Sequence, residues 1–153
     1  MKKLMLAVAL IGIFAVSAYA GGEDAPAAIK ASFSKLYPNV QKVKWGKEDA
    51  NYEAEFDLNK VETSCLFDAS GNLLETETEI AISSLPKAVS DYCTKTFEGK
   101  KISEASKIVD SKKVVTYEAE VKGVGDVIFD EKGNFLKKVV EQKDEKGKKD
   151  EKK

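Results

Sequence analysis

The feature that most constrains the fold of this sequence is an internal duplication. The motif YEAEF at residues 52–56 recurs as YEAEV at 117–121, and LFDASGNLL at 66–74 recurs as IFDEKGNFL at 128–136. The two motifs occur in the same order in both halves, so we expect two copies of one supersecondary unit. Neighbouring copies of such a unit bury a shared face that a single copy covers poorly.

Each copy is predicted to begin with a helix. Asp24 and Ser84 are residue types that cap helix N-termini. Pro26 and Pro86 follow two positions later and fit the first turn, because a missing N–H group costs nothing there. Apolar residues then recur at spacings of three and four, which places them on one face of a helix. These residues are Ile29, Phe33, Leu36 and Tyr37 in the first copy, and Leu85, Val89, Cys93 and Phe97 in the second.

Antiparallel strands are predicted to follow each helix. Tyr52, Ala54 and Phe56 alternate with Glu53 and Glu55, as in a strand with one buried and one solvent-facing side. The predicted strands are 40–45, 52–58, 61–68 and 73–80 in the first copy, and 102–109, 114–121, 126–130 and 135–140 in the second.

The segment D-x-x-G-N at 68–72 and 130–134 joins two of these strands in each copy. It predicts a hairpin turn with Gly71 and Gly133 in the left-handed conformation. A calcium loop would need alternating acidic ligands and a closing Glu, which are missing here, so a turn is the preferred interpretation.

Together these elements predict an α+β fold: two tandem helix-plus-antiparallel-strands repeats form one sheet with both helices on one face. The units would cover about residues 24–80 and 83–140 within a domain of residues 21–140. Residues 141–153 carry no apolar side chain. We expect a disordered charged tail there, because such a segment cannot offset its ordering entropy.

Residues 1–20 are predicted to be a cleavable signal peptide. Lys2 and Lys3 precede an uncharged apolar run at 4–16, and a small-x-small cleavage site ends at Ala20. The apolar run is shorter than the roughly 20 residues that a spanning helix needs, and no later segment is apolar enough. We therefore expect no membrane span after cleavage and a periplasmic or secreted location.

The composition disfavours nucleic-acid binding and most classes of enzyme. The formal net charge is −1 and lysines alternate with acids, whereas nucleic-acid-binding proteins concentrate basic residues on one face. The chain has no histidine, which excludes His-dependent catalytic triads and removes the commonest transition-metal ligand. No Gly-rich phosphate-binding loop is present. We expect a protein that is not an enzyme and that needs no cofactor.

The order of these motifs resembles the PepSY-like family with a beta-lactamase-inhibitor-like fold. The resemblance rests on VKW at 43–45, YEAEF at 52–56, FDASGN at 67–72 and the second copy, and it covers about residues 25–140. It implies an exported protein of the kind common in Bacteroidetes-type bacteria, with two units sharing one sheet and no established catalytic activity. In related folds the open face of the sheet binds and inhibits partner proteins.

The solvent-facing side of the predicted sheet is the candidate functional surface. We hypothesise that it recognises a protein or peptide of the cell envelope, with inhibition as one form of that role. An ordinary solvated face is the simpler interpretation. A second functional hypothesis is an envelope protein that binds a small ligand or Ca²⁺, a cation that favours several carboxylate oxygens. The residues predicted to line this surface are Glu53, Glu55, Asp57, Glu75, Glu77, Glu118 and Glu120.

Three further residues leave alternatives open. Cys65 and Cys93 are both predicted to face the core, and an oxidising compartment allows a disulfide between them. They could equally be two separate buried thiols that pack as small apolar residues. Trp45 has no counterpart in the second copy and is either a core residue or an exposed anchor for a partner.

Overall fold

The structure is a computed structural model that describes residues 24–139. The predictions of a signal peptide at 1–20 and of a disordered tail at 141–153 lie outside the described residues. Within residues 24–139, no helix is long and apolar enough to cross a membrane.

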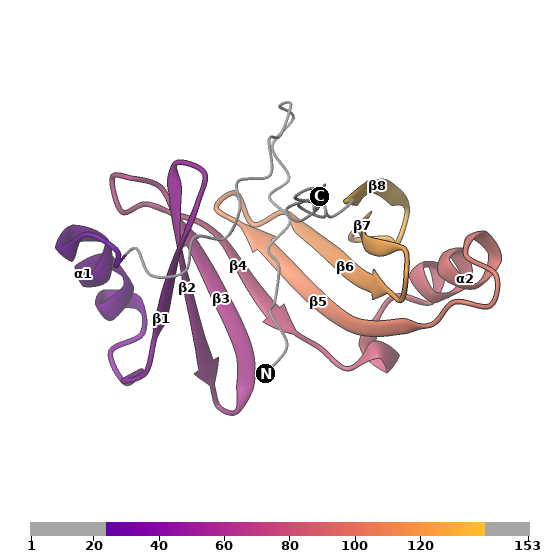
Figure 1. Ribbon diagram of the computed structural model, residues 1–153, viewed down its shortest axis with the longest axis horizontal. Coiled ribbons are helices and arrows are strands. Elements are labelled where there is room, and N and C mark those ends of the chain that lie inside the picture. Colours follow the sequence, from indigo (N-terminus) through magenta and orange to yellow (C-terminus); the bar gives the residue numbers. More distant parts are fainter. Residues whose placement is uncertain (1–23, 140–153) are drawn as a thin grey trace, which may run out of the picture.

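Eight antiparallel strands form one open sheet in which the strand order follows the chain (Figure 1). Each half consists of a helix followed by four strands, which confirms the predicted α+β class. The first half contains α1 (Ala27–Leu36), β1 (Lys44–Glu48), β2 (Asn51–Leu58), β3 (Val61–Phe67) and β4 (Leu73–Glu79). The second contains α2 (Lys87–Thr96), β5 (Ile102–Asp110), β6 (Val115–Val121), β7 (Gly125–Asp130) and β8 (Phe135–Val139), and the short 3₁₀ helix η1 (Ile82–Ser84) links the halves.

The helix starts differ from the prediction. Pro26 and Pro86 themselves occupy the N-cap positions, and neither helix has a side-chain cap. Asp24 instead forms an ion pair with Lys30, at 2.5 Å between the carboxylate and ammonium groups. Ser84 is the last residue of η1 and lies two positions before the N-cap residue Pro86. The fixed φ of proline therefore replaces the expected polar caps as the local signal for helix entry.

Both helices cover the same face of the sheet, as predicted. Cross-strand partners project to the same side. One continuous row of partners runs from Phe56 on β2, through Thr78 on β4 and Lys107 on β5, to Phe129 on β7. Phe56 packs in the core under α1 and Phe129 in the core under α2, so the two helices lie on one side.

The core is split into two clusters, one beneath each helix. In the first, the Phe33 ring of α1 meets the rings of Phe56 and Trp45 edge-on, with centroids 4.9 and 5.6 Å apart. In the second, Val89 of α2 is fully buried among strand residues of the second half. Trp45 is half-buried against the first cluster, which supports its interpretation as a core residue.

The two predicted hairpin turns are built identically. The Asp68 carboxylate accepts backbone N–H bonds from Ser70 and Asn72 at 2.8 and 2.9 Å, and Asp130 does the same in the second half. Gly71 and Gly133 both have φ of +83°, which confirms the left-handed conformation. The carboxylates of these segments are thus engaged in holding the turns.

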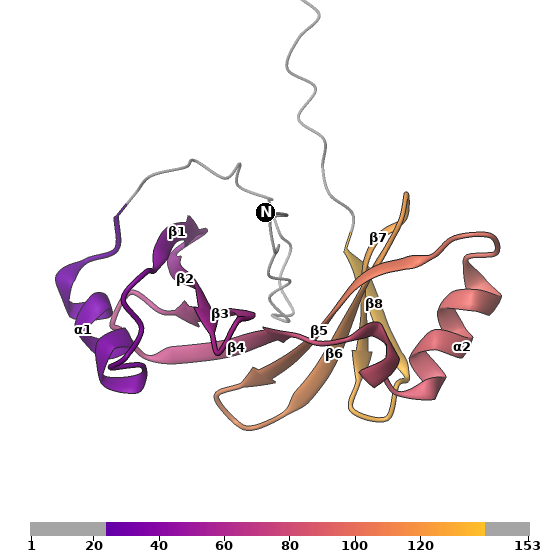
Figure 2. The same cartoon turned by 90° about the horizontal axis from the view of Figure 1, so that it is seen from below.

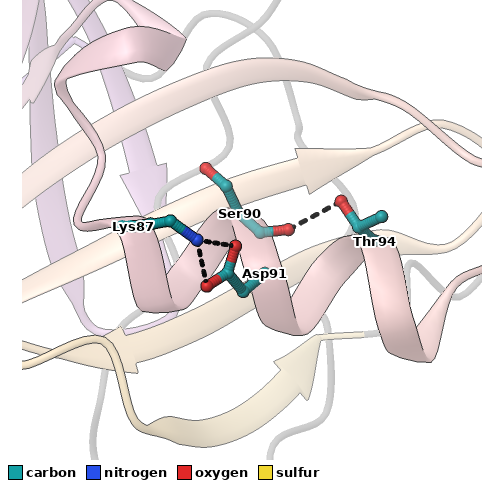
Figure 3. A network of polar contacts seen from close by, with 4 residues as sticks. All are labelled: Lys87, Ser90, Asp91 and Thr94. Atoms are coloured by element: carbon teal, nitrogen blue, oxygen red, sulfur yellow. Dashed lines mark hydrogen bonds and ion pairs between the residues drawn. The ribbon is translucent and has the colours of Figure 1, made fainter.

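The outer side of α2 is solvated and tied by local polar contacts (Figure 3). The Lys87 ammonium group contacts both carboxylate oxygens of Asp91 at 2.6 Å, and the Thr94 hydroxyl donates to the carbonyl of Ser90 at 2.8 Å. An exposed ion pair at a spacing of four residues, such as Lys87–Asp91, contributes only about 0.3–0.5 kcal/mol. The helix is therefore held mainly by its buried face.

Candidate binding site on the helix-free face

The sheet has a second face that neither helix covers, and we call it the helix-free face. Three rows of cross-strand partners define its centre: Glu53–Leu66–Glu75, Glu55–Ser64–Glu77–Ile108 and Ser106–Glu118–Ile128. Asp57 and Glu120 follow by strand alternation on β2 and β6. The structure therefore brings all seven acidic residues predicted from the sequence to one surface, drawn from three strands.

The sheet is bent so that the helix-free surfaces of its two halves face each other. Figure 2 shows β1–β4 on one side and β5–β8 on the other, with α1 and α2 at the two outer ends. The joint is the β4–β5 pair, in which Glu77 is the partner of Ile108. Side chains of the central strands that project from the helix-free face therefore lie on the inside of the bend.

The predicted solvent exposure of this surface is wrong at its centre. Glu53, Glu77 and Glu118 are only 4, 0 and 6 % exposed, and Glu75 is also buried. Glu55 and Glu120 are half-buried, and Asp57 is the exposed member of the set. Alternation correctly indicated which side each residue faces. It could not indicate how deeply each side chain is buried, because strand alternation fixes only the side of the sheet that a residue faces.

Asp126 on β7 belongs to the same centre, although the sequence did not single it out. It is 7 % exposed and is the cross-strand partner of Glu120. Its alternation with Ile128 along the strand could have placed Asp126 on this face, but the residues that follow it form a short apolar run. We refer to Glu53, Glu75, Glu77, Glu118 and Asp126 as the buried acidic cluster.

The members of this cluster shift one another's proton affinity. Desolvation raises the pKa of Glu53 to about 7, with the nearby Glu55 carboxylate adding to the rise. Desolvation also raises the pKa of Glu77, and the carboxylates of Glu53, Asp126 and Glu75 raise it further. Glu118 follows the same pattern, with its pKa raised by burial and then by Glu77 and Asp126.

The bend shown in Figure 2 accounts for the influence of Asp126 on the pKa of Glu77. These residues lie on β7 and β4, and three strand spacings in a flat sheet would separate them by about 14 Å. Glu53 on β2 acts on the same carboxylate from the other side. Acidic groups from both halves therefore converge on Glu77.

Several carboxylate oxygens of the cluster have no hydrogen-bond partner. Both oxygens of Glu77, Oε1 of Glu53 and Oε2 of Glu118 are buried without one. The Ser106 hydroxyl lowers the pKa of Glu77 and offsets part of its rise, but no geometric hydrogen bond joins the two groups. An unsatisfied buried polar group costs about 1–3 kcal/mol, and more when it is charged. In the free protein these carboxylate oxygens therefore lack hydrogen-bond donors, which a bound ligand could supply.

The surroundings of the cluster are apolar in part. Leu66, Ile108 and Ile128 share the helix-free face and are 0, 3 and 1 % exposed. Lys44 on β1 and Lys137 on β8 share it as well, on the two edge strands. Lys44 pairs with Glu55 at the rim. The basic strand residues of this face are thus at its edges and the buried acids at its centre.

No group of three or more Cys, Asp or Glu side chains is arranged to hold a metal ion within residues 24–139. Glu48 on β1 adds a further carboxyl group toward the edge of this face. Burial, and then the Glu53 carboxylate, raise the pKa of Glu48 to about 8. These acids share a face without forming a ready-made coordination shell.

The suggested disulfide is absent. Cys65 and Cys93 are both buried free thiols, and they belong to different core clusters, one under α1 and the other under α2. The sequence correctly placed both on the helix-covered side. It could not show that the core is split into two clusters, with one cysteine in each.

Comparison with known proteins places this architecture among bacterial relatives. A family model described as "beta-lactamase-inhibitor-like, PepSY-like" matches residues 22–74 and 50–137. A BLIP-like protein of Bacteroides fragilis is 27 % identical, with a TM-score of 0.61 over 81 % of this chain and 93 % of that one. None of the curated proteins matches the chain.

Two further solved structures share the fold at lower identity. A DUF2874 family protein of Bacteroides uniformis is 22 % identical, with a TM-score of 0.65 over 74 % of this chain and 87 % of its own. A protein of Bacteroides eggerthii is 19 % identical, with a TM-score of 0.67 over 76 % of this chain and 89 % of its own.

Proposed function

The chain belongs to the beta-lactamase-inhibitor-like, PepSY-like family, and on that premise we propose that it is a non-catalytic binding module of the periplasm. In this proposal it recognises a protein or peptide through the helix-free face of its sheet. The observation that carries the proposal is the asymmetry of the sheet. One face is sealed by two helices, whereas the other gathers buried carboxylate oxygens that have no partner in the free protein.

Binding fits the cluster better than catalysis. Acid–base catalysis needs a proton donor and a proton acceptor whose environments push their pKa values apart. Burial raises the pKa of Glu53, Glu77 and Glu118 alike, so the cluster does not separate two such roles. The cluster has no histidine to act with Ser64 or Ser106, since the chain contains none. The description of the Bacteroides fragilis neighbour as BLIP-like supports a protein partner, and inhibition remains within the proposal.

Site-specific photo-crosslinking in cells tests the location of the site. A photoreactive amino acid at Asp57, which is exposed on the helix-free face, should give a protein adduct in the envelope fraction. The same amino acid at Lys95, which is exposed on α2, is the matched control and should give none. Adducts formed from Lys95 but not from Asp57 would move the binding surface to the helices and refute the proposal.

A further inference from the structure

We infer that the partner segment recognised by the helix-free face is basic, and that one of its lysine or arginine side chains reaches the carboxylate of Glu77. The inference rests on the proposed function and names the chemistry of its partner. It is argued from the charge of the face, the unmet hydrogen bonds at its centre and the apolar surface beside them.

The charge of the helix-free face is one-sided. Acidic residues occupy it on every strand from β2 to β7. They include Glu62, Glu79, Glu104 and Asp110 in addition to the predicted seven and Asp126. The lysines on its strands are confined to β1 and β8. Complementary charge gives a partner its orientation and speeds its approach. A basic segment is therefore the favoured occupant.

Glu77 gives this surface a specific point of attachment. It has no exposed surface, so a partner side chain reaches it only when neighbouring side chains move aside, and neither of its carboxylate oxygens has a hydrogen-bond partner. A charge-assisted bond from an ammonium or guanidinium group is about twice as strong as a neutral one, and an arginine can satisfy both oxygens at once. A bound cation would thus supply the hydrogen bonds that the Glu77 carboxylate lacks in the free protein.

A long cationic side chain fits this position better than a bare metal ion. Ile108 is the direct cross-strand partner of Glu77, and Ser64 is its partner on the other side. Lysine and arginine bury their aliphatic stems on apolar surface while their charged ends bind acids. Ca²⁺ instead takes six to eight oxygen ligands, and no ligand group of that kind is assembled within the described part of the chain.

Binding of the cation must compete with protons. The titratable groups around Glu77 are Glu75 and Glu79 on its own strand, Glu53 and Glu55 on β2, Glu62 on β3, Asp110 on β5, Glu118 on β6 and Asp126 on β7. Lys137 on β8 acts on Glu118. Because burial and mutual repulsion raise the pKa of Glu77, the empty site holds a proton more readily than an exposed carboxyl does. A bound cation displaces that proton, so binding should strengthen as the pH rises.

Isothermal titration of the protein, purified from the periplasm, with octalysine tests the inference. Octaglutamate serves as the charge control. We expect octalysine to bind at pH 8, with an apparent affinity at pH 6 lower by about tenfold or more. At pH 7, titrations in phosphate and in Tris should give different heats, because protons released by the protein are taken up by the buffer. Octaglutamate should not bind.

Two matched variants separate the buried carboxylate from general surface charge. Glu77→Gln keeps the size of the side chain and should remove most of the pH dependence and lower the affinity at pH 8 by about tenfold. Glu98→Gln removes the same charge from an exposed position after α2 and should leave both unchanged. Circular dichroism of each variant establishes that it is folded.

Three results would overturn the inference. The first is octalysine binding to Glu77→Gln as tightly as to the wild type. The second is CaCl₂ binding with proton release in the absence of octalysine binding, and the third is no octalysine binding at any pH. Any of these outcomes combined with crosslinking from Asp57 leaves the proposed function in place and rejects only the basic partner. The absence of both octalysine binding and Asp57 crosslinking rejects the two proposals together.

Discussion

Replacement of Glu53 by glutamine should stabilise the protein at alkaline pH and have little effect in mild acid. Burial raises the pKa of Glu53 from 4.5 to about 7, so the folded state holds a proton that the unfolded chain releases in this range. Unfolding is therefore favoured as the pH rises from 4.5 to about 7, and the free energy of unfolding falls over that window. Glutamine keeps the shape of the side chain but cannot ionise.

The expected magnitude follows from the pKa. Each pKa unit corresponds to about 1.36 kcal/mol, so a rise of about 2.5 units gives roughly 3 kcal/mol. The difference in the free energy of unfolding between E53Q and the wild type should thus be about 3 kcal/mol larger at pH 8 than at pH 4.5, in the direction of a more stable E53Q. The comparison between the two pH values cancels any loss that does not depend on ionisation, such as an altered contact with Ser64.

Urea unfolding followed by Trp45 fluorescence provides the measurement. Trp45 is the only tryptophan in the chain and lies against the first core cluster, so its emission reports the packing of the half that contains Glu53. E98Q removes an exposed charge and serves as the control. If E53Q and E98Q show the same pH dependence as the wild type, the desolvation of Glu53 and the electrostatic account of the cluster are both wrong.

Two further predictions concern the turn that contains Gly133 and the two buried cysteines. G133A should destabilise the protein more than G99A does, by at least about 1 kcal/mol in urea unfolding. Both glycines have positive φ, but a Cβ at Gly133 would lie 2.8 Å from the Cβ of Ala88, whereas a Cβ at Gly99 meets nothing within 4 Å. Equal losses would contradict the close packing of this turn against α2. The two thiols should resist a thiol-specific reagent in the native protein and both react in urea, because burial raises the pKa of Cys65 and of Cys93. A protein mass lower by two hydrogens under non-reducing conditions would instead reveal a disulfide.

The bend of the sheet connects the fold to the proposed role. A flat eight-stranded sheet would expose the acids of β2, β4 and β6 to water, where their mutual repulsion is weak. In the bent sheet, Glu77 is desolvated, and the carboxylates of Glu53 and Asp126 raise its pKa further. The free protein therefore carries destabilising repulsion at a place where a cationic partner can relieve it. Sites of binding commonly retain such local costs.

The sequence by itself determined the order of the elements and the side of the sheet that each residue faces. The duplicated YEAEF and D-x-x-G-N motifs predicted two equivalent halves, and strand alternation assigned Glu53 and Glu77 to the face opposite Phe56. These properties are local, because the side-chain period of a strand and the left-handed conformation of Gly71 are decided within a few residues.

Only the tertiary structure decided which of those acids are buried. The exposure of Glu77 and Asp57 differs although both belong to the same alternating pattern, and the separation of Cys65 from Cys93 is invisible in their spacing. Burial depends on how the strands of both halves are arranged in space, which the alternation along one strand does not describe. Contacts between the halves join residues far apart in the chain, and no local pattern encodes their distance.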